Sequence, residues 1–99
     1  MANSCKLTSE HAVLKLHGKV NMDTANGLLQ DFKQQLSPDI NNLDCEHVSE
    51  ADSAAISLLL ACINHAHNHQ IELSVSGLGE QLLNLARLYE VEQLLTNHQ

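Results

Sequence analysis

Residues 43–59 read LDCEHVSEADSAAISLL, and this stretch decides the fold. At its start, Leu43 and Cys45 alternate with polar residues, which indicates a short strand over residues 41–45 with these two side chains facing inward. From Ala54 onward the apolar positions 56, 59, 60 and 63 follow the i, i+3, i+4, i+7 interval of one helix face. The stretch therefore predicts a strand, a loop over residues 48–55, and a helix from Ala54 to about His67 that Asp52 or Ser53 caps.

Further strands are expected on both sides of this stretch. Alternating polarity indicates a strand over residues 12–17, ended by Gly18, with residues 6–8 as a short partner before it. A third segment of alternating polarity over residues 71–75, closed by Gly77, is typical of a half-buried strand.

Two more helices complete the pattern. Apolar residues spaced by 3 and 4 positions indicate a helix over residues 22–36, with Met22 on its apolar face and Asn21 as its N-cap. A last helix over residues 80–90 is expected to bury Tyr89 and to be followed by a short turn that folds back over residues 91–95. Strands alternating with helices predict a single α/β domain, residues 1–99, with helices covering a sheet.

The charge balance limits the kinds of partner. Five Lys and Arg stand against 12 Asp and Glu, for a net charge of −7, and Phe32 and Tyr89 are the only aromatic residues. A protein that binds nucleic acids or anionic membrane surfaces needs clustered positive charge, so we expect neither kind of partner. The longest nearly apolar run, residues 54–63, is shorter than the ~20 residues of a membrane span. No direct membrane insertion and no export signal are expected, which favours the cytoplasm. The acidic charge balance favours a basic protein partner.

No signature of an enzyme or a cofactor site is present. The sequence has no Gly-rich phosphate loop and no nucleophile elbow, and its three cysteines show no metal-binding spacing. We therefore predict no catalytic residue, no cofactor and no metal centre. His65, His67 and His69 leave one question open, because His65 and His69 have the i, i+4 spacing of a shared ligand. The position at a helix C-terminus, where the dipole favours His, and the absence of a Cys or carboxylate nearby in the sequence argue against a metal site.

The helix that begins near Ser53 carries the candidate partner-binding residues. One stripe of small or polar side chains runs along it, at spacings that place them on one side. Small side chains let a partner's backbone approach closely, although a neutral surface without a partner has the same composition. Asp52 and Ser53 at the helix start are either simple caps or, for Ser53, a place where a phosphate is accepted. The residues of this predicted site are Asp52, Ser53, Ala54, Ser57, Ala61 and Asn64.

The same segment resembles the signature of STAS domains, with a strand followed by an Asp-Ser helix start. Residues 14–21, LKLHGKVN, resemble the second strand of that family and its turn into the first helix. The resemblance covers essentially the whole chain and implies an anti-sigma factor antagonist-like fold with a mixed sheet of about four strands. One departure is Ala54-Ala55, where the family commonly has a Ser-Gly or Gly-Gly pair.

Two branches of the family suggest different functions. The tail LARLYEV, residues 85–91, resembles the C-terminal helix of the small STAS subunit of Mla-type phospholipid ABC transporters. That resemblance implies a non-catalytic subunit that binds the cytoplasmic ATPase and, through it, the membrane permease, peripheral to the inner membrane. The alternative is an anti-sigma factor antagonist that is switched by phosphorylation at Ser53.

Overall fold

The computed structural model describes residues 5–96. The elements of this part of the chain are, in order, β1 Lys6–Glu10, β2 Val13–Val20, α1 Ala25–Gln35, β3 Asn42–Ala51, α2 Ser53–Asn68, β4 Ser74–Ser76, α3 Glu80–Leu88 and α4 Glu92–Thr96. The alternation of strands and helices is the predicted one. None of these helices is both long and apolar enough to cross a membrane.

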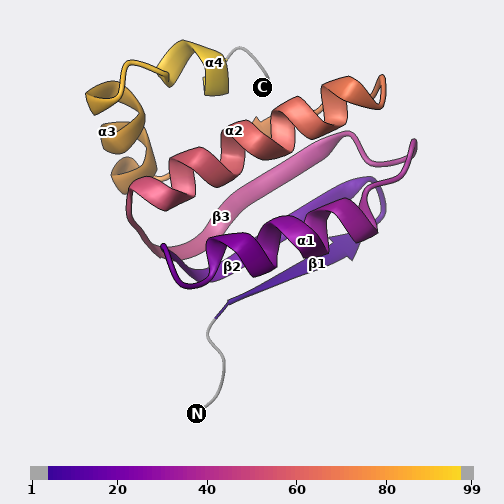
Figure 1. Cartoon of the computed structure of the whole chain (residues 1–99), viewed down its shortest axis with the longest axis horizontal. Helices are drawn as coiled ribbons and strands as arrows, with labels where there is room; N and C mark the ends of the chain where they lie inside the picture. Colours follow the sequence, from indigo (N-terminus) through magenta and orange to yellow (C-terminus); the bar gives the residue numbers. More distant parts are fainter. Residues whose placement is uncertain (1–4, 97–99) are drawn as a thin grey trace.

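The four strands form one mixed sheet in the order β1-β2-β3-β4. β1 and β2 form an antiparallel pair, whereas β2 with β3 and β3 with β4 are parallel. Each parallel pair needs a crossover connection, which α1 and α2 supply. The two helices lie side by side on one face of the sheet, with α3 and α4 next to α2 (Figure 1). The predicted α/β architecture is confirmed.

The core fills the space between the sheet and the two crossover helices. Leu14, Leu43 and Val75 form one row across three neighbouring strands, and each is almost fully buried. Phe32 of α1 and Leu59 of α2 are buried equally well on the helix side. Burial of such side chains stabilises the fold by about 1.5–3 kcal/mol each, which sets the positions of both helices.

The strand residues that alternate with the core residues form a second row, on the other side of the sheet. This row runs across all four strands as Thr8, Lys15, Asp44 and Ser76, and none of its members is buried. We call this side the open sheet face, and it also carries His17, Glu46 and His47 beside the row. The molecule therefore has two different outward surfaces, one on the helices and one on the sheet.

β3 is longer than predicted, because it continues to Ala51 where a loop over residues 48–55 was expected. Its second half is polar, so no alternation of polarity marks it as a strand. Parallel pairing with β2 extends it nevertheless, with Gly18 opposite Val48 and Val20 opposite Ala51. β2 likewise continues through Gly18, which was expected to end it. Gly18 adopts φ 87°, and a register irregularity follows it, so the glycine accommodates a bulge within the strand.

The start of α1 also differs from the prediction. Asn21 was expected to cap the helix, but its side chain accepts hydrogen bonds from the Asp23 and Thr24 N–H groups, at 2.9 and 3.1 Å, in a turn before the helix. Thr24 is the N-cap, and α1 begins at Ala25. Met22 therefore lies in the turn and is 80% exposed, not on the buried face of the helix.

The C-terminal elements match the prediction in order and differ in detail. β4 spans only Ser74–Ser76, although Leu73 before it is buried in the core. α3 ends at Leu88, and Tyr89 follows it as the C-cap, 51% exposed, so the expected burial of Tyr89 is wrong. The predicted final turn is α4, which folds back and buries Leu95 completely.

Candidate interaction surface

The N-terminus of α2 lies where three segments meet. β3 ends at Ala51, and Asp52 caps the helix, since its Oδ1 accepts a hydrogen bond from the Ala54 N–H at 2.8 Å. The other oxygen, Oδ2, accepts from the Met22 N–H at 3.3 Å, and the Asp52 N–H donates to the Val20 carbonyl at 3.2 Å. Asp52 thus holds the end of β2, the turn before α1 and the start of α2 together. Of the two predicted caps, Asp52 and Ser53, it is Asp52 that caps the helix.

The stripe predicted along this helix lies on its outer side. Ser53, Ser57 and Asn64 are exposed, and Ala54 and Ala61 are half-buried at its edge. We call these five residues the α2 ridge. Leu60 and Ile63, which were expected on the apolar face, lie at the margin of that face and are half-buried. The side of α2 that faces the core consists of Ala55, Ile56, Leu58, Leu59, Cys62 and Ala66.

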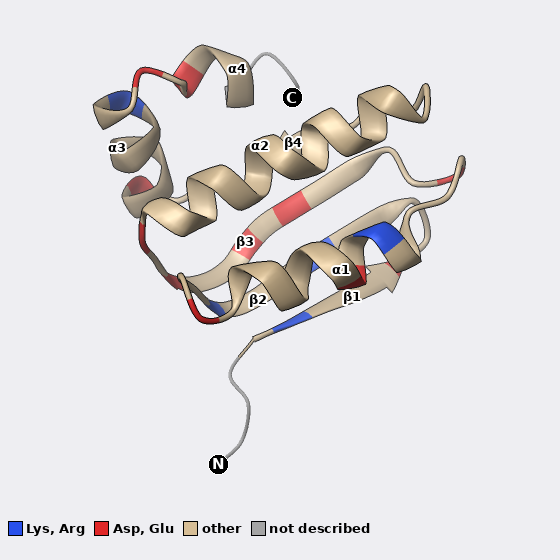
Figure 2. Cartoon of the chain, viewed as in Figure 1, with Lys and Arg blue, Asp and Glu red and all other residues tan. Residues whose placement is uncertain are grey.

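No Lys, Arg, Asp or Glu occurs along the 16 residues of α2. Figure 2 shows this helix without a red or blue segment from end to end, in a chain whose net charge is −7. Acidic residues instead surround its N-terminal end. Asp52 caps it, Asp23 lies in the turn that contacts Asp52, and Glu80 begins α3 next to Gln81, whose Oε1 accepts from the Ala51 N–H at 3.2 Å. The result is an uncharged surface with an acidic margin.

Two exposed apolar side chains on segments that contact α2 were not among the predicted partner-binding residues. Met22 is fixed beside the N-terminus of α2 by the hydrogen bond of its N–H to Asp52. On α3 a shallow hollow of about 490 Å³ is lined by Gln81, Leu85 and Leu88, and Leu88 is 70% exposed. Met is enriched at protein interfaces, whereas a single exposed Leu is normal on a protein surface. The sequence does not indicate that Met22 is exposed, because the apolar periodicity of the first helix extends through it.

A scan of protein families matches residues 4–96 to the model described as Mlab, STAS domain. This match spans nearly the whole chain. The chain belongs to the STAS domain family. Among solved structures, that of the anti-sigma factor antagonist SpoIIAA in its unphosphorylated form is similar to this STAS domain, with a TM-score of 0.62 and 11% sequence identity. The similarity covers 90% of this chain and 83% of SpoIIAA, and it shows a shared fold. No curated protein matches the sequence.

Ser53 is the first residue of α2 in this STAS domain, and its side chain is exposed. The backbone N–H groups at a helix start and the helix dipole favour a negative charge there. Ser53 is therefore accessible to a modifying enzyme as well as to a docking partner. The geometry is compatible with both functions that the sequence suggested.

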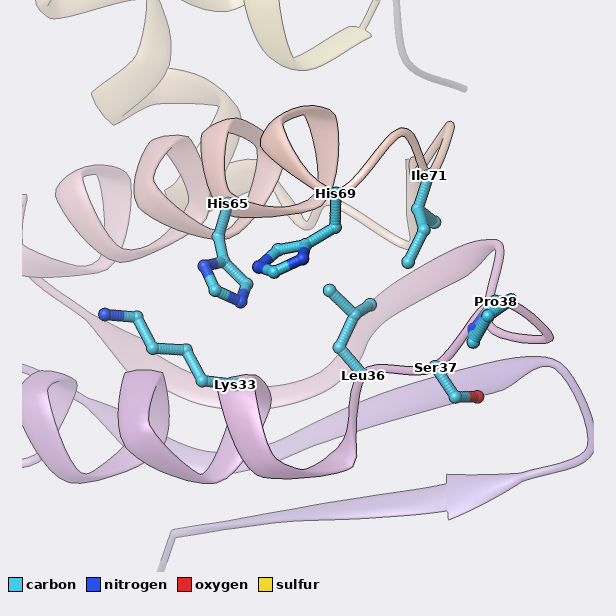
Figure 3. Close-up of a pocket in the computed structure, with 7 residues that line it drawn as sticks. All are labelled: Lys33, Leu36, Ser37, Pro38, His65, His69 and Ile71. Atoms are coloured by element: carbon cyan, nitrogen blue, oxygen red, sulfur yellow. The ribbon is translucent and has the colours of Figure 1, made fainter.

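The three histidines near the C-terminus of α2 do not converge. The rings of His65 and His69 approach each other, with centroids 4.4 Å apart, whereas His67 is exposed. His65 and His69 line a pocket of about 210 Å³ together with Lys33, Leu36 and Ile71 (Figure 3). The pKa of His65 lies below its ordinary value because of burial, and because His69 and Lys33 disfavour a further positive charge. Within residues 5–96, no third His, Cys or carboxylate joins the pair as a metal ligand.

The buried cysteines are chemically inert. Cys45 and Cys62 face the core, and burial raises the pKa of each thiol to about 12. A thiol with such a pKa remains protonated at neutral pH and is a poor nucleophile.

Proposed function

We propose that this STAS domain is the non-catalytic accessory subunit that binds the cytoplasmic ATPase of an Mla-type phospholipid ABC transporter. Such a transporter maintains the lipid asymmetry of the outer membrane, and the subunit supports assembly or activity of the ATPase. The observation that carries the proposal is the uncharged α2 ridge on an otherwise acidic domain. The description of the matching family model, Mlab, supports the choice of transporter.

The side chains of the ridge suit a protein partner. Ser53, Ser57 and Ala61 are short, so a helix of the ATPase can approach the backbone of α2 closely. Further exposed apolar area comes from Met22, beside the start of α2, and from Leu88 on the neighbouring helix α3. The absence of charge along α2 and the Met beside its start are features of interface centres, whereas Ser and Ala are less frequent there. The ridge therefore contributes close backbone approach and not a large side-chain area.

The acidic margin complements this uncharged centre. In the proposed complex, Asp23, Asp52 and Glu80 would meet basic residues at the rim of the ATPase surface. Rim charges of this kind mainly accelerate association and are screened by salt. The subunit then lies in the cytoplasm, reaches the inner membrane through the ATPase, and contacts the permease only indirectly.

A charge placed in the centre of the ridge tests the proposal. Ser57→Glu puts a carboxylate where the partner would desolvate it, so affinity for the purified ATPase should fall by about 100-fold or more. Gln30→Glu adds the same charge at an exposed position of α1, away from the ridge, and should bind like the wild type. Biolayer interferometry with the immobilised ATPase measures both affinities. Unchanged binding of Ser57→Glu would overturn the proposed surface.

The second candidate is the anti-sigma factor antagonist switched at Ser53. The exposed position of Ser53 in the first turn of α2 and the fold shared with SpoIIAA favour it. A pull-down of the tagged chain from its source cells in mild detergent separates the two candidates. Recovery of an ATPase with a permease supports the transporter subunit, whereas a kinase-like anti-sigma factor, with phosphate on Ser53, supports the switch.

A further inference from the structure

A group of potential metal ligands lies on the open sheet face, on the other side of the core from the α2 ridge. Asp44, Glu46 and His47 of β3 each offer one ligand atom, and these three atoms all lie within 4.8 Å of one another. An ion seated between them requires each ligand atom to shift by roughly 1 Å or less to reach zinc bond lengths of about 2.0–2.2 Å. Glu46 and His47 are exposed and Asp44 is half-buried, so an ion can enter from solvent.

A β-bulge creates this group. Lys15 pairs with Asp44 and His17 pairs with His47, so β3 advances three residues where β2 advances two. In a regular strand, neighbouring residues point to opposite faces, and His47 would point toward the core next to Cys45. The extra residue in β3 leaves both Glu46 and His47 exposed, next to each other on the outer side. Bulges commonly redirect a side chain in this way.

The ring of His47 has a defined position. It stacks on the ring of His17 from β2, with centroids 5.0 Å apart and an angle of 9° between the planes. His17 is itself held by a hydrogen bond between its Nε2 and the Thr8 hydroxyl, at 3.0 Å. The His47 imidazole is thus held in place by His17, which in turn is held by Thr8. Neighbouring residues of this kind orient the ligands of metal sites.

The Asp44 carboxylate occupies space that a glycine leaves open. A Cβ on Gly77 would lie 2.5 Å from Asp44 Oδ1 and 2.7 Å from the Glu46 N atom, and Gly77 adopts φ 70°. The same Oδ1 accepts a hydrogen bond from the Glu46 N–H at 2.9 Å, which fixes the carboxylate. Lys15, opposite Asp44, pairs its ammonium group with Glu10 at 2.6 Å and also interacts electrostatically with the Asp44 and Glu46 carboxylates.

We infer that Asp44, Glu46 and His47 bind one divalent transition-metal ion, with Zn²⁺ as the best fit, at the open sheet face. One imidazole and two carboxylates are a ligand set that zinc accepts, and water or a ligand of a partner completes the coordination. His17 acts as a positioning residue that holds the His47 ring. The inference is independent of the proposed docking function, since the α2 ridge contributes no residue to it.

The test uses the full chain without an affinity tag, at pH 7.5, titrated with Zn²⁺ in a calorimeter. We expect one equivalent to bind, and His47→Gln or Asp44→Asn to weaken binding by at least 10-fold while circular dichroism shows an unchanged fold. The double variant His65→Gln/His69→Gln removes the other close histidine pair and should bind zinc like the wild type.

Two further readouts make the outcome unambiguous. Co²⁺ bound by the proposed ligands should give an absorption spectrum that His47→Gln abolishes and that His17→Phe, which keeps a stacking ring, largely retains. The inference is wrong if the wild type binds no zinc at 1 mM. It is also wrong if zinc binding survives His47→Gln and is lost in the His65/His69 double variant, because the ion then sits on α2.

Discussion

The α2 ridge and the open sheet face are both outward surfaces of one small core, yet their chemistry is opposite. The ridge carries short, uncharged side chains along a helix without a single Lys, Arg, Asp or Glu. The sheet face gathers carboxylates, imidazoles and a lysine on neighbouring strands. The first surface lacks the charges that the centres of protein interfaces also lack, and the second offers oxygen and nitrogen ligands for ions. The two surfaces therefore differ in chemistry, although both depend on the same buried residues.

The largest expected effect comes from the core that the two surfaces share. Leu59 is 1% exposed on the inner side of α2, facing the sheet. Leu59→Ala should lower the free energy of unfolding by about 2–5 kcal/mol, because the lost apolar contacts leave a cavity. Urea denaturation followed by circular dichroism measures the change. A loss below about 1 kcal/mol would mean that α2 is not anchored on the sheet through this residue.

A smaller effect, restricted to the sheet side, is expected at Gly77. In Gly77→Ala, the alanine must adopt the left-handed backbone conformation of Gly77, and its methyl group lies against Asp44 and Glu46. We expect a loss of about 1–3 kcal/mol of stability, from the strained backbone together with the displaced Asp44 carboxylate. Gly79→Ala is the steric control, because nothing lies within 4 Å of the added atom, and as a change at the N-cap of α3 it should cost no more than about 1 kcal/mol. Amide shifts in NMR spectra should be confined to β3 and β4, and extensive shifts along the α2 ridge would contradict the separation of the two surfaces.

The smallest expected effect is a pH dependence of stability that His65 on α2 causes. The pKa of His65 is lowered by burial and by repulsion from His69 and Lys33, so the unfolded chain takes up this proton at a higher pH than the folded chain does. The free energy of unfolding therefore falls as pH drops below about 6.5. His65→Gln should lose less stability than the wild type between pH 7.5 and pH 5.5. Urea titrations at the two pH values measure the loss of stability in both proteins. If the variant and the wild type lose the same amount, His65 has the same pKa in the folded and the unfolded chain.

Much of the helix side was predictable from local patterns. The apolar periodicity of residues 54–67 and the Asp-Ser start are local signals, and the structure places α2 at Ser53–Asn68 with Asp52 as its cap. The exposed positions of Ser53, Ser57 and Asn64 followed from the same helical period. Met22 was misplaced, because the same periodicity ran through a turn that Asn21 stabilises by hydrogen bonds.

The sheet side was less predictable. No spacing pattern in the sequence marks Asp44, Glu46 or His47 as a metal ligand. Nothing in residues 46–51 signals a strand by alternation, so neither the length of β3 nor its bulge was foreseen. Pairing with β2 keeps residues 46–51 in a strand although their own strand propensity is weak, because hydrogen bonds between the strands stabilise the extended backbone.

The sequence by itself determined the order of strands and helices, the STAS resemblance, a cap at Asp52 or Ser53 and the absence of charge from α2, because each depends on residues that are close together in the chain. Only the tertiary structure decided that Met22 lies beside the start of α2, that His17 stacks on His47, and that Gly77 leaves space for the Asp44 carboxylate. These contacts join segments that are 30 or more residues apart. Parallel pairing and a bulge bring them together, and neither leaves a periodic mark in the sequence.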